Sequence, residues 1–161
     1  MSSAPKAVFP DFEHSLPMLL LKAREAVMMR FRPMLRDVGL TEQQWRVIRA
    51  LSEVEEYDAG KLAAVSYILS PSLTRILQRL EARELIRRRV DDADQRRTLI
   101  SLTADGRALF NAVRPLSRDI YEEIASNLGA SRLSGLYNIL EEVEQRLLAA
   151  APTEQDERRG R

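Results

Sequence analysis

The sequence predicts a mainly α-helical chain of the α+β class, with a single β-hairpin. Two observations predict this class. Apolar residues recur at steps of three and four over most of the chain, as they do along one face of a helix. One stretch, LIRRRVDDADQRRTLISL (residues 85–102), instead places two β-forming runs around an Asp-rich loop. With 161 residues, the chain is long enough for one domain with an oligomerisation extension.

Residues 13–40 are predicted to hold the first helix, whose apolar side chains lie nearly all round its axis. One face carries Leu16, Leu19, Leu20, Ala23, Val27, Phe31 and Met34, and other sides carry Met18, Leu21, Met28 and Met29. A helix that is apolar on most sides is buried on most sides. We therefore expect it to pack between its own domain and a partner, as a dimerisation helix.

Three shorter helices follow. Thr41 and Gln44 have the spacing of a capping box, which predicts a second helix with Trp45, Ile48 and Leu51 on its inner face. A third helix is predicted to begin at Asp58 and to bury Leu62 and Val65. A fourth begins at Ser70, with Pro71 in the first turn, where a missing N–H is tolerated.

Two helices are predicted after the hairpin, over residues 103–150. Thr103 caps the fifth helix and Gly129 ends it. The sixth begins at Ser131, and its leucine-rich seam has heptad spacing. The seam consists of Leu133, Leu136, Leu140, Val143 and Leu147. The seam indicates that the sixth helix packs against a partner helix.

Residues 70–83, SPSLTRILQRLEAR, form the most informative segment. Leu73, Ile76, Leu77 and Leu80 make one apolar stripe. The opposite face holds Pro71, Thr74, Arg75, Gln78 and Ala82, flanked by Ser72 and Arg79, and it contains no acid. Small hydroxyls, an amide and arginines suit the base edges and phosphates of DNA. An ordinary amphipathic surface helix is the alternative interpretation of this segment alone.

The neighbouring elements favour DNA. Short helices followed by a polar-faced helix and a basic hairpin, here over residues 41–102, are the layout of a winged helix-turn-helix with a two-stranded wing. From Arg75 to Arg97 there are eight arginines against five acids, a local net charge of +3 in a chain whose total is +1. The remainder is therefore net acidic, as expected for a protein with one DNA-facing side.

The composition limits other functions. The chain has no cysteine and one histidine, which excludes disulfides and disfavours metal sites. The N-terminus, MSSAPKAVFPD, has no signal-peptide pattern, and no run approaches the roughly 20 apolar residues of a membrane span. We expect a cytoplasmic protein without cofactor, metal or membrane partner, with disordered tails at 1–12 and 151–161.

The chain resembles the MarR family of winged-helix regulators. The resemblance rests on LSPSLTRILQRLEARELIRR and DDADQRRTLISLTADGRALF, where Asp94, Arg96, Leu102, Thr103 and Gly106 match the hairpin signature of the family. It covers roughly residues 13–150. The stretches LLLKAREAVMMRFRP and LTEQQWRVIRAL further resemble a subfamily that regulates the breakdown of aromatic acids such as homoprotocatechuate.

The resemblance implies a homodimeric repressor of an aromatic-acid catabolic operon that binds a pseudo-palindromic site in double-stranded DNA. Residues 13–40 and 103–150 would be its dimerisation helices. Ser70, Ser72, Thr74, Arg75 and Arg79 would face the major groove, and Arg96 the minor groove. Asp94 would orient the wing by pairing with an arginine. Pro71, Gln78, Arg88 and Arg97 complete the predicted DNA-binding set, to which Asp94 does not belong.

The resemblance also implies a small aromatic carboxylate as the effector. Such a pocket needs apolar walls and a few polar groups. The candidates are His14, Ser15, Arg24, Trp45 and Arg46. For Arg24, a surface ion pair with Glu25 or Asp37 is the alternative; for Trp45, a place in the core.

Three other functions compete with this interpretation. An enzyme lacks support, because the sequence has no cysteine, no Gly-rich phosphate loop and no paired carboxylates on one helix face. A helical interaction module would leave the acid-free face of residues 70–83 unexplained. A DNA-binding regulator without an effector stays open.

Overall fold

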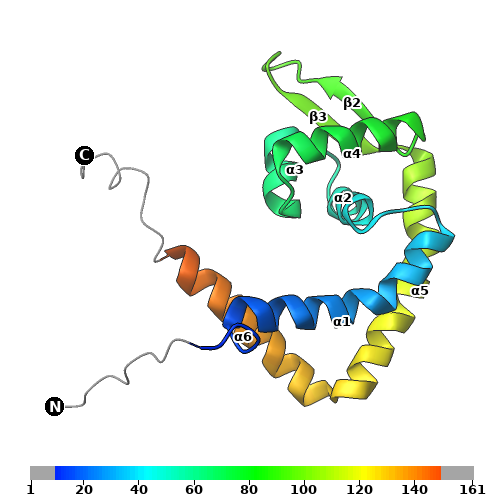
Figure 1. The fold of residues 1–161 in the computed structure, drawn as a ribbon. Coiled ribbons are helices and arrows are strands. Elements are labelled where there is room, and N and C mark those ends of the chain that lie inside the picture. The colour runs from blue at the N-terminus through cyan, green and yellow to red at the C-terminus, as the bar shows by residue number, and fades with distance from the viewer. Residues whose placement is uncertain (1–9, 150–161) are drawn as a thin grey trace, which may run out of the picture. The chain divides into compact units, whose positions relative to one another are not determined.

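The structure, a computed structural model, describes residues 10–149, so the tails predicted at 1–12 and 151–161 lie outside these residues except for positions 10–12. The elements are α1 (Leu16–Asp37), α2 (Glu42–Ser52), β1 (Tyr57–Asp58), α3 (Ala59–Ser66), α4 (Ser70–Ala82), β2 (Ile86–Val90), β3 (Thr98–Leu102), α5 (Ala104–Leu128) and α6 (Ala130–Ala149) (Figure 1). The predicted fold class is confirmed. The chain divides into two compact units, residues 1–120 and 121–161.

The core of the first unit is built around α2. The Thr41 hydroxyl accepts the Gln44 N–H at 3.2 Å and the Gln44 side chain accepts the Thr41 N–H at 2.9 Å, so the predicted capping box is present. The largest fully buried side chains come from α2, α3, α4, both long strands and α5. They are Val47, Ile48, Leu51, Leu62, Leu80, Ile86, Ile100 and Val113.

Helices α3 and α4 follow the prediction with one correction. Asp58 caps α3 by accepting the Lys61 N–H at 2.9 Å. Leu62 is buried, but Val65 is 39% exposed, contrary to prediction. The reason is that the eight-residue α3 turns Leu62 and Ser66, one turn apart, toward the core. In α4 the whole predicted stripe, Leu73, Ile76, Leu77 and Leu80, is buried.

The two-stranded wing is confirmed, and its hairpin belongs to a three-stranded antiparallel sheet of order β1-β3-β2, whose first strand was not predicted. In the hairpin, Ile86 pairs with Leu102 and Val90 with Thr98. The additional strand pairs Tyr57 with Ile100 and Asp58 with Leu99. A two-residue strand is too short to show the alternation that reveals strands in a sequence.

Helix α1 leaves most of its apolar surface uncovered. Only its last two turns contribute buried residues, namely Phe31, Met34 and Leu35. Earlier positions are exposed, including Leu16, Leu19, Leu20, Leu21 and Val27. This exposure is consistent with the prediction that the helix packs between its own domain and a partner.

Helix α6, in the second unit, has no buried residue. Three seam positions, Leu136, Leu140 and Leu147, are exposed together with Leu148. Exposed apolar surface on this scale calls for a partner. Within residues 10–149, no helix combines the length and apolar character needed to cross a membrane.

Candidate nucleic-acid interface

The outer face of α4 is as predicted. Its DNA-facing candidates are all exposed, and they are Ser70, Pro71, Ser72, Thr74, Arg75, Gln78 and Arg79. The Thr74 hydroxyl donates to the Ser70 carbonyl at 3.1 Å, which leaves the oxygen lone pairs available outward. The helix begins after Leu69, and no side chain caps it.

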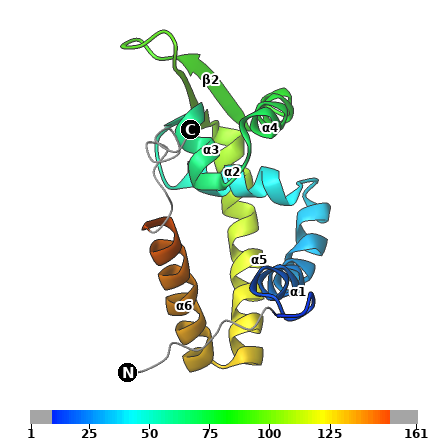
Figure 2. The same ribbon diagram turned by 60° about the vertical axis from the view of Figure 1, so that its left-hand side comes forward.

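The hairpin and α4 lie at the same end of the first unit in both views (Figures 1 and 2). Strand β2 follows α4 directly, and the Glu81 carboxylate of α4 accepts hydrogen bonds from Arg88 of β2. These hydrogen bonds hold the pKa of Glu81 below its usual value and raise that of Arg88. The base of the wing is thus tied to the helix that precedes it, and Arg88, a predicted DNA contact, is engaged within the chain.

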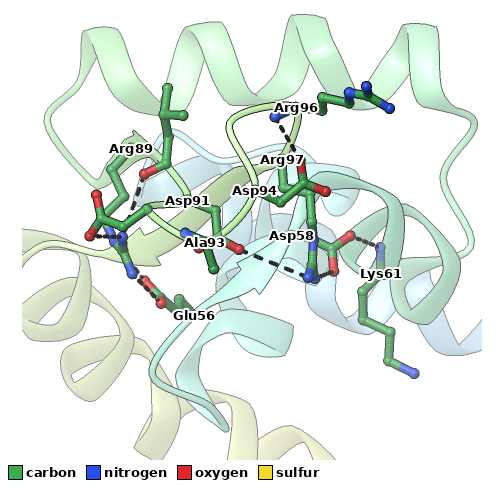
Figure 3. A network of polar contacts seen from close by, with 11 residues as sticks. Glu56, Asp58, Lys61, Arg89, Asp91, Ala93, Asp94, Arg96 and Arg97 are labelled. Atoms are coloured by element: carbon green, nitrogen blue, oxygen red, sulfur yellow. Dashed lines mark hydrogen bonds and ion pairs between the residues drawn. The ribbon is translucent and has the colours of Figure 1, made fainter.

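Two further wing arginines are tied to the segment around β1 (Figure 3). Arg89 donates to both carboxylate oxygens of Glu56, at 3.1 and 2.6 Å. Arg97 donates to Asp58 at 2.7 Å and lies 3.9 Å from Asp91. The pKa of Asp58 is lowered first by the Lys61 N–H and then by Arg97. One carboxylate therefore caps α3 and holds the wing.

The aspartates of the loop shape the turn. Asp91 accepts the Ala93 N–H and Asp94 accepts the Arg96 N–H, each at 3.0 Å. Asp94 was expected to orient the wing by pairing with an arginine, and it accepts the backbone N–H of Arg96 while its charge is among those that raise the pKa of Arg97. A carboxylate two residues before an N–H closes an Asx turn, and this needs no cation.

Arg75, Arg79 and Arg96 differ from the other arginines of this surface. Among the residues that the structure describes, none of these three guanidinium groups has an acid or hydrogen-bond partner, whereas Arg87 donates to the Ser101 hydroxyl at 3.0 Å. Figure 3 shows the Arg96 side chain pointing away from the ion pairs of the wing. These three cations, two on α4 and one at the wing tip, are the groups left to meet phosphates or base edges.

Arg83, just after α4, was not singled out from the sequence. Its guanidinium donates to the carbonyls of Gly39 at 2.6 Å and Val38 at 3.3 Å. These carbonyls follow the end of α1, where an N–H donor satisfies groups that the helix leaves open. The contact joins residues 44 positions apart, so no local pattern could have revealed it.

The predicted effector residues have other partners here. Arg24 and Arg32 each contact both Glu25 and Glu42, at 2.5 to 2.9 Å, in a closed ring of alternating charge. Burial opposes ionisation of Glu42, but the hydrogen bonds from Arg32 and Arg24 outweigh it and lower its pKa. For Arg24, pairing with Glu25 was the alternative foreseen.

The other candidates are dispersed. Trp45 is 7% exposed and stacks on Phe110 with ring centroids 5.9 Å apart. Arg46 donates to the Ser66 carbonyl at 2.9 Å. His14 contacts Asp11 at 2.8 Å and Ser15 donates to the Phe12 carbonyl, both in exposed positions. Over residues 10–149, no cluster of three or more His, Cys, Asp or Glu side chains could hold a metal ion.

A capped three-helix lobe, an exposed acid-free helix face and a basic β-hairpin beside it define a winged-helix DNA-binding protein. The MarR family model matches residues 40–98. The chain is 43% identical to the homoprotocatechuate degradative operon repressor of Escherichia coli, over 80% of this chain and 86% of that protein. It is 40% identical to the HTH-type transcriptional regulator FarR of Neisseria gonorrhoeae, over 77% and 85%.

A solved structure agrees with these relatives. NadR in complex with 4-hydroxyphenylacetate superimposes with a TM-score of 0.78 at 36% identity, over 85% of this chain and all of that chain. The chain belongs to the MarR family.

Proposed function

We propose that this chain is a dimeric transcriptional repressor that controls the breakdown of an aromatic acid. One observation carries the DNA-binding part. The exposed face of α4 and the wing tip together present Arg75, Arg79 and Arg96 without acid partners, whereas Arg88, Arg89 and Arg97 of the wing are tied to acids and Arg87 to the Ser101 hydroxyl. A helix of this kind enters the major groove, and a wing reaches the adjacent backbone or minor groove.

Two exposed apolar surfaces support the dimer. The first half of α1 and the seam of α6 expose leucines that a second copy of the chain could cover. Residues 13–40 and 103–150 would then form the dimer, and residues 41–102 the DNA-binding lobe. A two-fold dimer reads an inverted repeat whose half-sites are about 10 base pairs apart.

The aromatic effector is supported by the relatives and by the charge ring. A degradative operon repressor and a structure with 4-hydroxyphenylacetate are both similar to this chain. In the ring, Arg24 already holds two carboxylates, so its site has the chemistry to bind an acid. An incoming carboxylate would exchange with Glu25 or Glu42 and favour a lobe spacing that cannot span both half-sites.

A gel-shift titration with an inverted repeat selected by the protein from a random DNA library tests DNA binding. Arg96→Ala should weaken binding without unfolding the protein. Arg75→Ala should cost about 1–3 kcal/mol and relax the preference at one base position, if it reads a base. Arg36→Ala, which removes an exposed arginine outside α4 and the wing, is the matched control. Unchanged affinity on losing Arg96 would remove the wing from the mechanism.

Calorimetry with 4-hydroxyphenylacetate and cinnamate tests the effector. We expect binding to the wild type and a much weaker signal for Arg24→Gln, which keeps a hydrogen-bonding group but removes the charge. DNA binding by Arg24→Gln should survive without release by the acid. Absence of heat at millimolar acid would favour a DNA-binding regulator that senses no small molecule.

A further inference from the structure

Leu69 is the large apolar side chain that is most exposed among the described residues, at 80%. It belongs neither to the core nor to the surfaces of α1 and α6 assigned to the dimer. Its position is the N-cap of α4, directly before Ser70. An apolar side chain that stays exposed to water contributes no hydrophobic stabilisation to the fold.

The N-cap position makes the residue still less favourable for folding. Serine, threonine, aspartate and asparagine are preferred there, because a side-chain oxygen accepts an N–H of the first turn. Leucine cannot do so, and α4 has no side-chain cap. By contrast, Thr41 and Asp58 cap α2 and α3. Residues that cost stability without a structural return are typical of functional positions.

The location indicates what Leu69 meets. In a helix-turn-helix, the N-terminal residues of the recognition helix are those that contact base edges in the major groove. The thymine C5-methyl group is the apolar feature of that groove, and apolar side chains read it. Hydroxyl, amide and guanidinium groups on the rest of the α4 face read hydrogen-bonding edges. Leu69 adds an exposed apolar side chain at the N-terminal end of the same helix.

We propose that Leu69 is a specificity-determining residue that recognises a thymine methyl group in each half-site. The proposal rests on the DNA-binding function proposed above and deepens it. It adds Leu69 to the polar residues of α4 as a further residue that reads a base.

The test pairs a substitution with a single-group change in DNA. Duplexes selected from a random library by the wild-type protein supply the binding site. Each thymine facing α4 is then replaced, one at a time, by uracil, which lacks only the methyl group. For the wild type, one such replacement should weaken binding about four-fold per methyl group, the effect of one buried methylene-sized group.

For the Leu69→Ser protein, replacing thymine by uracil should leave DNA binding unchanged. For Leu69→Met, whose side chain stays apolar, the same replacement should still weaken binding. Because serine restores a cap, Leu69→Ser should also raise the midpoint of thermal unfolding by about 2–4 °C. Weaker, methyl-independent DNA binding by a more stable protein cannot arise from damage to the fold.

The outcomes separate the two proposals. If the wild type selects no sequence, the DNA-binding proposal fails. If it selects a site but every uracil replacement is neutral, or if Leu69→Ser remains as methyl-sensitive as the wild type, the inference on Leu69 fails alone. An unchanged DNA preference together with an altered oligomeric state in Leu69→Ser would instead place Leu69 in a protein contact and overturn the inference.

Discussion

Gly106 shows how a single residue joins the wing to α5. A Cβ atom at this position would lie 1.9 Å from the Leu85 carbonyl oxygen and 3.2 Å from a methyl group of Leu102. The Leu85 carbonyl also accepts the Thr103 N–H at 3.1 Å, so this backbone cannot easily move away. Gly106 was identified from the sequence as part of the hairpin signature, and the structure supplies the physical reason for the glycine.

Gly106→Ala should lower the free energy of unfolding by about 1–3 kcal/mol, because the added methyl group overpacks a backbone contact. In an open helix, the same substitution stabilises by about 1 kcal/mol, since alanine is the better helix former. The sign of the change in unfolding free energy therefore distinguishes a tight backbone contact from an open helix position, and denaturant unfolding measures it. A more stable Gly106→Ala protein would show that α5 can move away from Leu85.

The wing shows, at the scale of an element, which features a sequence can reveal. Strands 86–90 and 98–102 were predicted because β-forming residues flank a turn-rich loop. Their partners were not, because Glu56 and Arg89 are 33 positions apart and Asp58 and Arg97 are 39 apart. Charge counting recognised the arginines as a basic cluster but could not divide them into paired and unpaired groups, which only tertiary structure decides.

Asp58→Asn should loosen the wing and leave α3 in place. The amide oxygen can still accept the Lys61 N–H, but the ion pair with Arg97 is lost. We expect faster hydrogen exchange at neutral pH for the amides of Asp91 and Arg97, whose hydrogen bonds close the loop. Exchange in α3 should stay unchanged.

The difference in loop hydrogen exchange between wild type and Asp58→Asn depends on pH because the pKa of Asp58 is lowered. The ionised carboxylate is the form that the fold stabilises, so its contribution is present above the ordinary pKa of 3.8 and is lost as the pH falls through the lower value in the fold. Wild type and Asp58→Asn should therefore converge only well below pH 3.8. Equal loop exchange at pH 7 would contradict the role given to Asp58.

For the whole molecule, the unpaired arginines set the salt dependence of DNA binding. Arg75, Arg79 and Arg96 supply three cations per protomer and six per dimer. Each neutralised phosphate contributes about −0.9 to the slope of log K against log salt concentration, so contacts by these six cations alone give a slope of about −5. If all eight arginines from Arg75 to Arg97 met phosphates, the slope would approach about −14. Gel shifts at several salt concentrations distinguish these values.

The exposed apolar surfaces of α1 and α6 predict a stability that depends on concentration. If a second copy covers them, folding and association are coupled, and the unfolding midpoint rises with protein concentration. Thermal unfolding over a hundred-fold concentration range measures this. A midpoint independent of concentration would indicate a stable monomer.

At this scale, the sequence predicted the helices well because their apolar stripes are long and regular. It identified the exposed face of α4, since Leu73, Ile76, Leu77 and Leu80 leave only one side for solvent. It missed β1, which has two residues, and it placed Val65 in the core because a short helix leaves the direction of its stripe ambiguous. The sequence could not show the partners of the proposed effector residues, since Arg24 and Arg46 contact distant segments of the chain.

The pairing of wing arginines with acids has a consequence on the chromosome away from the operator. Non-operator DNA offers every protein the same phosphates, and a chain with net charge +1 that has tied up Arg88, Arg89 and Arg97 has little to offer in return. We therefore expect weak and salt-sensitive binding to random sequence, which would leave most copies available to search. A small number of molecules per cell can then keep one operator occupied and still release it promptly when the signal arrives.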